Sequence, residues 1–162
     1  MSKRIAYGGI LLALNIILLM LVNIIPTNTI SIMALSSFLL AIVVVEFGFK
    51  MGVVYYVAVA CLSFIILSNK FHWILYVLTF GVYGIAKYVL EITKNIYMEY
   101  FLKIAYANIA MVIVVILMKQ FMYIPVNIYT IVGFEIMFLI YDRVYSNFII
   151  YYYDKLRSKL RI

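Results

Sequence analysis

The sequence predicts an all-α, polytopic membrane protein with six transmembrane helices in one bundle. Of its 162 residues, 69% are hydrophobic and 12% are charged, whereas soluble domains carry about 25% charged residues. The apolar residues form six long stretches, and most charged residues lie between them. Crossing a bilayer core takes about 20 helical residues, and backbone groups in lipid must bond within their own segment, so each stretch is expected to be a helix.

Each predicted helix is an apolar stretch bounded by charged residues, a proline or a polar turn. In chain order the stretches are Ile5–Ile25, Ile30–Val45, Met51–Leu67, Trp73–Ile92, Tyr100–Met118 and Ile124–Tyr145. The first ends at Pro26, which begins a tight turn over residues 26–29. The second is short for a span, and a turn over residues 46–50 follows it. A longer loop over residues 93–99 follows the fourth, and Pro125 opens the last.

The basic residues are unevenly distributed between the predicted connections. With the N-terminus inside, eleven of the thirteen Lys and Arg residues lie on the inner side, and only Lys70 and Lys119 lie outside. Basic residues concentrate on the cytoplasmic side of membrane proteins, so both termini are predicted to be cytoplasmic. The same rule accounts for the net charge of +7, and nucleic-acid binding is not expected. The length fits one transmembrane helical domain over residues 1–162.

Several classes of chemistry lack their residues in this sequence. Cys61 is the only cysteine and there is one histidine, so neither a disulfide nor a metal centre of several Cys or His ligands is expected. The metalloprotease HExxH, the hydrolase GxSxG and the Walker A patterns do not occur. We therefore expect no enzyme activity, no catalytic residues, no bound metal and no cofactor.

Glu135 is the most informative single residue, because it lies near the middle of the last stretch. A carboxylate at that depth costs at least about 2.5–3.5 kcal/mol, so it marks a transport pathway, a ligand or a partner by default. The alternative is a structural carboxyl bonded to a Tyr or Asn of a neighbouring helix. Asn15 and Asn108 are amides in mid-span, where such groups join helices or line a cavity.

Aromatic residues with hydroxyl groups are concentrated in the outer halves of the third and fourth stretches. They are Tyr55, Tyr56, Tyr76 and Tyr83, from a total of 16 tyrosines. Such rings suit a flat, partly polar ligand, so these four are candidate substrate-binding residues together with Glu135 and Asn108. The alternative is an aromatic belt at the membrane interface.

Two further patterns concern charge and close packing. Lys87 and Glu91 have the i,i+4 spacing of a helical ion pair. The adjacent acid and base Asp142 and Arg143 lie at the inner end of the last stretch, where they are expected to be solvated at the membrane interface. The C-terminal tail from Asp154 alternates basic and apolar residues after the aromatic run Tyr151–Tyr153, which is typical of an interfacial segment on anionic lipid. A plain positive-inside anchor is the simpler alternative.

The first stretch carries Gly9 and Ala13, a small-xxx-small step that allows another helix to approach closely. With the basic start Lys3-Arg4, this resembles the opening of the S components of energy-coupling factor (ECF) transporters, although the family more often has Ala in place of Gly9. The six-span layout, the Pro26 turn and the short second span are also similar.

The resemblance implies a membrane-embedded subunit that captures a vitamin or similar micronutrient from outside the cell. It implies that Gly9 and Ala13 contact a transmembrane coupling subunit, which two ATPases power. It also implies a pocket that includes the loop after the first span, with Asn28 as a candidate contact. The chain would reside in the plasma membrane of a prokaryote as a multi-pass protein.

Two other function classes fit the same composition. One is a structural membrane subunit of a cell-envelope complex, similar in length and hydropathy to the small rod-shape membrane protein. The other is an autonomous small-solute or proton-coupled transporter that uses Glu135. A co-purified small molecule, bound wall-synthesis proteins, or uptake by the chain alone would distinguish the three.

The charge distribution generates a topology prediction. A reporter fused after Ile162 should be cytoplasmic, and single cysteines at residues 70 and 120 should react with a membrane-impermeant thiol reagent from outside. An externally exposed C-terminus would contradict the six-span arrangement.

Overall fold

The structure is a computed structural model that describes residues 2–92, 95–119 and 127–157. The described residues form helices joined by short turns, with no strand among them, as the sequence predicts. The chain divides into two compact units, Met1–Lys94 and Asn95–Ile162. The single domain over residues 1–162 remains a prediction from the sequence.

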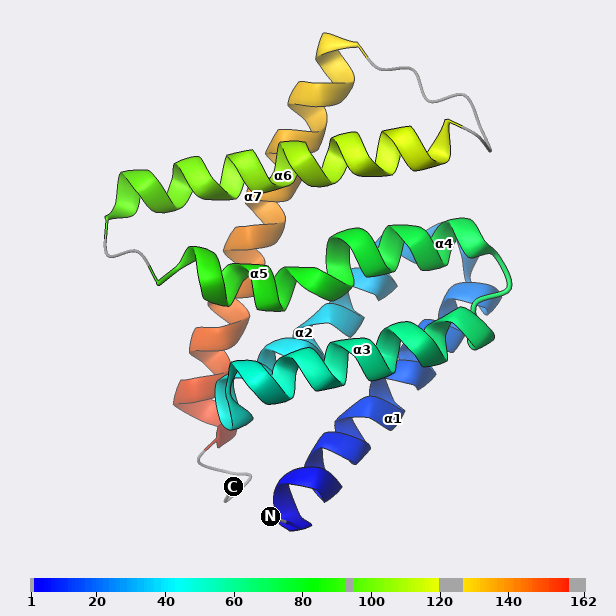
Figure 1. The fold of residues 1–162 in the computed structure, drawn as a ribbon, viewed down its shortest axis with the longest axis vertical. Coiled ribbons are helices and arrows are strands. Elements are labelled where there is room, and N and C mark those ends of the chain that lie inside the picture. Colours follow the sequence, from blue (N-terminus) through cyan, green and yellow to red (C-terminus); the bar gives the residue numbers. More distant parts are fainter. Residues whose placement is uncertain (1, 93–94, 120–126, 158–162) are drawn as a thin grey trace. The chain divides into compact units, whose positions relative to one another are not determined.

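The first unit consists of helices that lie side by side, connected by turns of a few residues (Figure 1). They are α1 (Ser2–Ile24), the short 3-10 helix η1 (Pro26–Asn28), α2 (Thr29–Phe47), α3 (Phe49–Ile66), α4 (Lys70–Leu75), the π-helical turn η2 (Tyr76–Gly81) and α5 (Val82–Leu90). The segments α4, η2 and α5 follow one another without a break over Lys70–Leu90, so together they are the predicted fourth span.

Helix α2 is the centre of the first unit. It packs against α1, α3, η2 and α5. Its buried residues lie on all sides of the helix, among them Met33, Leu40 and Val43. A helix that is apolar all round is expected where neighbours surround it. The second stretch, predicted as Ile30–Val45, is thus longer at both ends than predicted and forms the core.

Two turns set the spacing of α1, α2 and α3. Pro26 opens η1, which confirms the predicted turn over residues 26–29. The turn predicted over residues 46–50 is wrong in extent, because α2 continues to Phe47 and Gly48 alone separates it from α3. Gly48 has φ +84°, a conformation that residues with a Cβ atom adopt only with strain. One turn later, a Cβ atom on Gly52 would collide with the Val44 side chain, so α2 and α3 are in close contact.

The corner between α3 and α4 is closed by hydrogen bonds to the carbonyl groups at the end of α3. The Lys70 ammonium donates to the carbonyls of Phe64 and Leu67, and the Trp73 indole donates to that of Ala60. Asn23 of α1 donates to the Ile66 carbonyl at 2.9 Å. A helix end has carbonyl groups without helical partners, and Lys70 and Asn23 satisfy two of these in the last turn of α3, those of Phe64 and Ile66.

The fourth span is interrupted by the π-helical turn η2. A π turn releases backbone groups from the regular α-helical pattern, and side chains bond to the carbonyls here. The Tyr56 hydroxyl of α3 donates to the Val77 carbonyl at 3.0 Å, and the Thr79 hydroxyl donates to the Leu75 carbonyl at 2.5 Å. A Cβ atom on Gly81 would lie 3.0 Å from the Tyr76 carbonyl oxygen, so the turn requires a small residue there.

The second unit contains α6 (Ile96–Met118), α7 (Ile128–Tyr151) and the π-helical turn η3 (Tyr152–Leu156), which continues α7. Figure 1 shows α7 crossing α6. The loop predicted over residues 93–99 is shorter than predicted, because the Asn95 side chain caps α6 and residues 96–99 are helical. The last stretch, predicted to end at Tyr145, continues to Tyr151, and its predicted start at Ile124 and Pro125 lies outside the described residues.

Five helices in the described part of the chain are long and apolar enough to cross a membrane. They are Arg4–Ile24, Pro26–Phe47, Phe49–Ile66, Lys70–Leu90 and Ile96–Leu117. Helix α7 is long enough, but Glu135, Asp142 and Arg143 fall within any part of it that would cross a bilayer. These helices fit a multi-pass membrane protein, and the sixth span and the sidedness of the termini stay predictions.

Candidate functional site

Asn15 of α1 is fully buried, and its side-chain amide bonds to α2, α3 and η2. Its nitrogen Nδ2 donates to the Ser36 backbone carbonyl at 3.0 Å and to the Tyr55 hydroxyl at 3.1 Å. Its oxygen Oδ1 accepts from the Ser36 hydroxyl at 2.5 Å and from the Tyr76 hydroxyl at 3.4 Å. We call Asn15, Ser36, Tyr55 and Tyr76 the Asn15 cluster.

Every hydrogen-bonding position of the Asn15 side chain has a partner within the protein. Asn15 uses both of its N–H groups and both acceptor positions of its oxygen. The Tyr55 hydroxyl, which accepts from Asn15, donates onward to the Leu11 carbonyl at 2.9 Å. A buried polar group stabilises a fold when its partners are present and costs free energy when they are not. The cluster therefore holds α1, α2, α3 and the fourth span in one register.

The structure joins three residues that the sequence analysis singled out separately, Asn15, Tyr55 and Tyr76, by hydrogen bonds. Asn15 was predicted to join helices or line a cavity, and it joins helices. Tyr55 and Tyr76, predicted as substrate-binding residues, are both buried members of the Asn15 cluster. Their substrate-binding role stays a prediction, and their hydroxyl groups already bond within the protein.

The other two tyrosines lie outside the cluster. Tyr56, half-buried, bonds to η2 through its hydroxyl. Tyr83 is 1% exposed on α5, and the Lys87 ammonium lies 6.0 Å from its ring centroid. Lys87 is also buried and forms the predicted i,i+4 ion pair with Glu91, which confirms that spacing argument.

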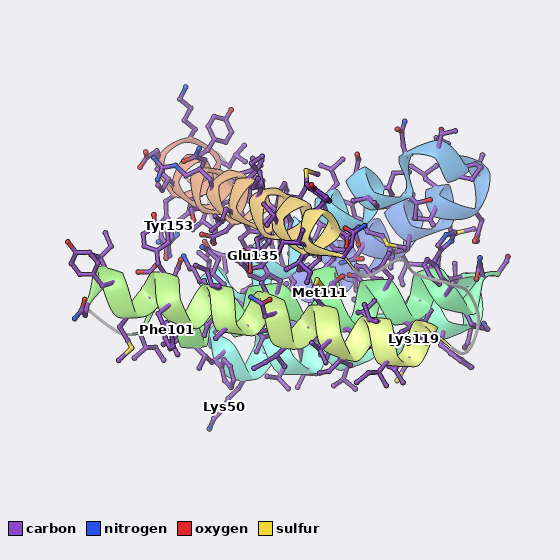
Figure 2. The ribbon with its side chains drawn as sticks, turned by 90° about the horizontal axis from the view of Figure 1, so that it is seen from above. Lys50, Phe101, Met111, Lys119, Glu135 and Tyr153 are labelled. Atoms are coloured by element: carbon purple, nitrogen blue, oxygen red, sulfur yellow. The ribbon has the colours of Figure 1, made fainter. Side chains whose placement is uncertain are left out.

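Glu135 of α7 bonds to Asn108 of α6, the two predicted mid-span polar residues of the second unit. The Asn108 amide donates to Glu135 Oε1 at 3.0 Å and to the carbonyl of Ile104, one turn earlier, at 3.0 Å. Figure 2 shows Glu135 on α7 beside α6. Glu135 is half-buried, and a carboxylate has about four acceptor positions, so it can bond to Asn108 and to a ligand or water at once.

Lys103 of α6 connects the same two helices through charge. It is 2% exposed and lies between two carboxylates, with Glu99 Oε1 at 2.6 Å and Asp142 Oδ2 at 3.0 Å. A buried ammonium is costly unless it is paired and hydrogen-bonded, so Lys103 ties Asp142 of α7 to α6. Lys103–Asp142 and Asn108–Glu135 are therefore two polar links between α6 and α7, which cross one another (Figure 1).

The sequence reasoning missed Ser36, Glu99 and the buried position of Lys103. Ser36 carries no signal, because a lone serine in an apolar helix is common. Glu99 and Lys103 have the i,i+4 spacing with the acid first, the favourable order, and that signal was available. Asp142 was assigned to the membrane interface, and it is 6% exposed and bonded to Lys103.

Gly9 and Ala13 lie on an open face of α1. Both are exposed, and a Cβ atom on Gly9 would meet nothing within 4 Å. The residues of α1 that pack inward, including Leu11, Leu19 and Val22, lie on the other side. Asn28 is exposed in η1, and its side chain does not cap α2.

The described residues contain no group of three or more His, Cys, Asp or Glu side chains placed to hold a metal ion. Cys61 is exposed on α3. No family model, curated protein or solved structure matches the chain. Functional inference therefore rests on the residues and contacts described above.

The bond lengths in the Asn15 cluster predict an order of mutational effects. Asn15→Leu should lower the free energy of unfolding most, by about 1–3 kcal/mol, because it leaves buried hydroxyls without their partner. Tyr55→Phe should cost less, and Tyr76→Phe least, since the Tyr76 bonds are the longest at 3.3 and 3.4 Å. Reversible unfolding in mixed micelles measures these values.

The matched control is Tyr129→Phe, because Tyr129 is 83% exposed. A loss for Tyr76→Phe as large as that for Asn15→Leu would contradict the assigned bonding.

Proposed function

We propose that the chain is the substrate-binding S component of an ECF-type importer, which captures a vitamin or similar micronutrient from outside the cell. The strongest support is the open face of α1. Gly9 and Ala13 are exposed there, on a helix whose opposite side is held in place by Asn15. Small exposed side chains on a fixed helix allow a second helix to approach closely.

The proposed assembly assigns the work of transport to other chains. A transmembrane coupling subunit would pack on the open face of α1, and two ATPases would supply the energy. The chain itself would hydrolyse nothing and would span the plasma membrane of a prokaryote six times, with both termini in the cytoplasm. The eleven-to-two distribution of basic residues supports that orientation.

The substrate is proposed to be a small molecule with polar groups. Glu135 and Asn108 are the proposed contacts in the second unit, because the half-buried carboxylate retains acceptor positions. A separate set of proposed contacts in the first unit consists of Tyr55, Tyr56, Tyr76, Tyr83 and Asn28.

Substitution of the open face of α1 tests the coupling role. Gly9→Leu/Ala13→Leu should leave folding and ligand capture intact, because the side chains would extend into open space. It should abolish association with the coupling subunit and ATPases, because Leu blocks close helix approach. Co-purification and uptake by cells measure the two effects.

The matched control is Gly133→Leu on α7, where a Cβ atom also meets nothing within 4 Å. Unchanged uptake in the double variant would contradict the coupling role. Capture of wall-synthesis proteins in place of ATPases would favour a structural role in the cell envelope.

A second candidate function is proton-coupled transport of a small solute by the chain alone. The observation that favours it is the half-buried Glu135 carboxylate at the contact of two helices, bonded to a neutral amide. A carboxylate whose neighbour is uncharged can bind and release a proton without breaking an ion pair. Such a transporter would take up solute without any ATPase.

Glu135→Gln distinguishes ligand binding from a structural role. The amide keeps the size and the hydrogen bond but not the charge, so loss of a charged ligand contact should weaken binding by about 1.5–3 kcal/mol. A structural role predicts altered thermal stability with unchanged affinity. Ligand titration beside a melting curve separates the two, and proton-driven uptake that disappears in the Gln variant would favour the second candidate.

A further inference from the structure

The C-terminal segment, defined here as Tyr151–Arg157, continues α7 through the π-helical turn η3. Three tyrosines stand in a row at its start. Tyr152 is 1% exposed, whereas Tyr151 and Tyr153 are 50% and 46% exposed. The middle ring is thus buried, and the other two are exposed. Figure 2 shows Tyr153 at this end of α7.

Each exposed ring carries a cation four residues later in the chain. The Lys155 ammonium lies 5.5 Å from the Tyr151 ring centroid, and the Arg157 guanidinium carbon lies 5.3 Å from that of Tyr153. Both distances are within the range of cation–π attraction. Lys155 and Arg157 are exposed, so the segment presents two parallel ring–cation pairs, each with the cation on the C-terminal side.

Most charged residues at this end of the chain are basic. Asp154 is the only acidic residue of the segment, against Lys155 and Arg157, and the sequence continues with Lys159 and Arg161. Tyrosine rings are stable at the level of lipid headgroups, and cations beside them are attracted to anionic lipid. Stacking on the rings limits the freedom of the two cations before any lipid binds, which lowers the entropy lost on binding.

We propose that the C-terminal segment is a binding site for anionic phospholipid headgroups at the membrane surface. The exposed rings of Tyr151 and Tyr153 would lie among the headgroups, and Lys155 and Arg157 would contact the phosphates. A lipid surface is the favoured occupant because the segment directly continues a helix of a chain whose other helices are apolar enough to cross a membrane. This inference is independent of the transported substrate.

Lipid titration of the full-length protein tests the proposal. Protein in dodecylmaltoside micelles is titrated with phosphatidylglycerol or phosphatidylcholine, and bound lipids are counted by native mass spectrometry. The wild type should bind phosphatidylglycerol in preference. Lys155→Gln/Arg157→Gln should weaken that binding, by roughly fivefold for each charge removed. Lys155→Arg/Arg157→Lys should restore it.

The matched control is Arg4→Gln/Lys50→Gln, which removes the same residue types and the same charge from exposed positions of the first unit. Figure 2 shows Lys50 projecting outward from α3. The control should bind phosphatidylglycerol as the wild type does. Equal losses in the two pairs would overturn the proposal in favour of a general charge effect, and so would a wild type that does not prefer the anionic lipid.

A second measurement applies even if the Lys155→Gln/Arg157→Gln variant fails to fold. A polarity-sensitive fluorophore is attached at Ile150→Cys, an exposed position next to the segment, in a Cys61→Ala background. Its emission should shift to the blue in nanodiscs containing phosphatidylglycerol relative to nanodiscs of phosphatidylcholine. Identical emission in the two lipids, or a shift caused only by an added acidic peptide, would overturn the proposal.

Discussion

The buried amide of Asn15 constrains the position of every membrane-spanning helix in the first unit. Within a bilayer no water is available to a polar side chain, so each donor and acceptor must find its partner in the protein. Asn15 finds four, on α2, α3 and the fourth span. Apolar contacts between these helices are non-directional and would tolerate sliding or rotation. The amide does not, because a shift of one residue on any helix would break its bonds.

In the second unit, charged side chains fix how the two helices meet. Lys103 bonds to carboxylates on both α6 and α7, and Asn108 links the same helices one turn and a half away. Buried ion pairs contribute little net stability, because desolvation offsets their attraction. Their effect is on specificity, since any other arrangement would leave a charge without a partner. The two units therefore use different polar groups for one purpose, which is to fix how apolar helices meet.

The sequence predicts the helices well and the contacts between them poorly. Apolar length and the positions of Pro26 and Lys70 are local signals, and all the spans of the first unit follow from them. Helix α2 is longer than predicted, because the turn was expected to begin at residue 46 and the helix continues to Phe47. The polar residues Asn15, Asn108 and Glu135 stand out in the sequence because a polar side chain in mid-span is costly, and each bonds to a neighbouring helix. Which partner each one bonds depends on helix rotation, and rotation leaves no mark in a sequence that is apolar on every side.

The turn between α2 and α3 has a consequence for how the protein enters the membrane. Gly48 alone connects the two helices, and its φ of +84° reverses the chain within one residue. No hydrophilic loop exists that could wait in the aqueous phase while the first helix partitions into lipid. Because a single residue joins them, α2 and α3 cannot move far apart, and they would enter a bilayer together as one helical hairpin.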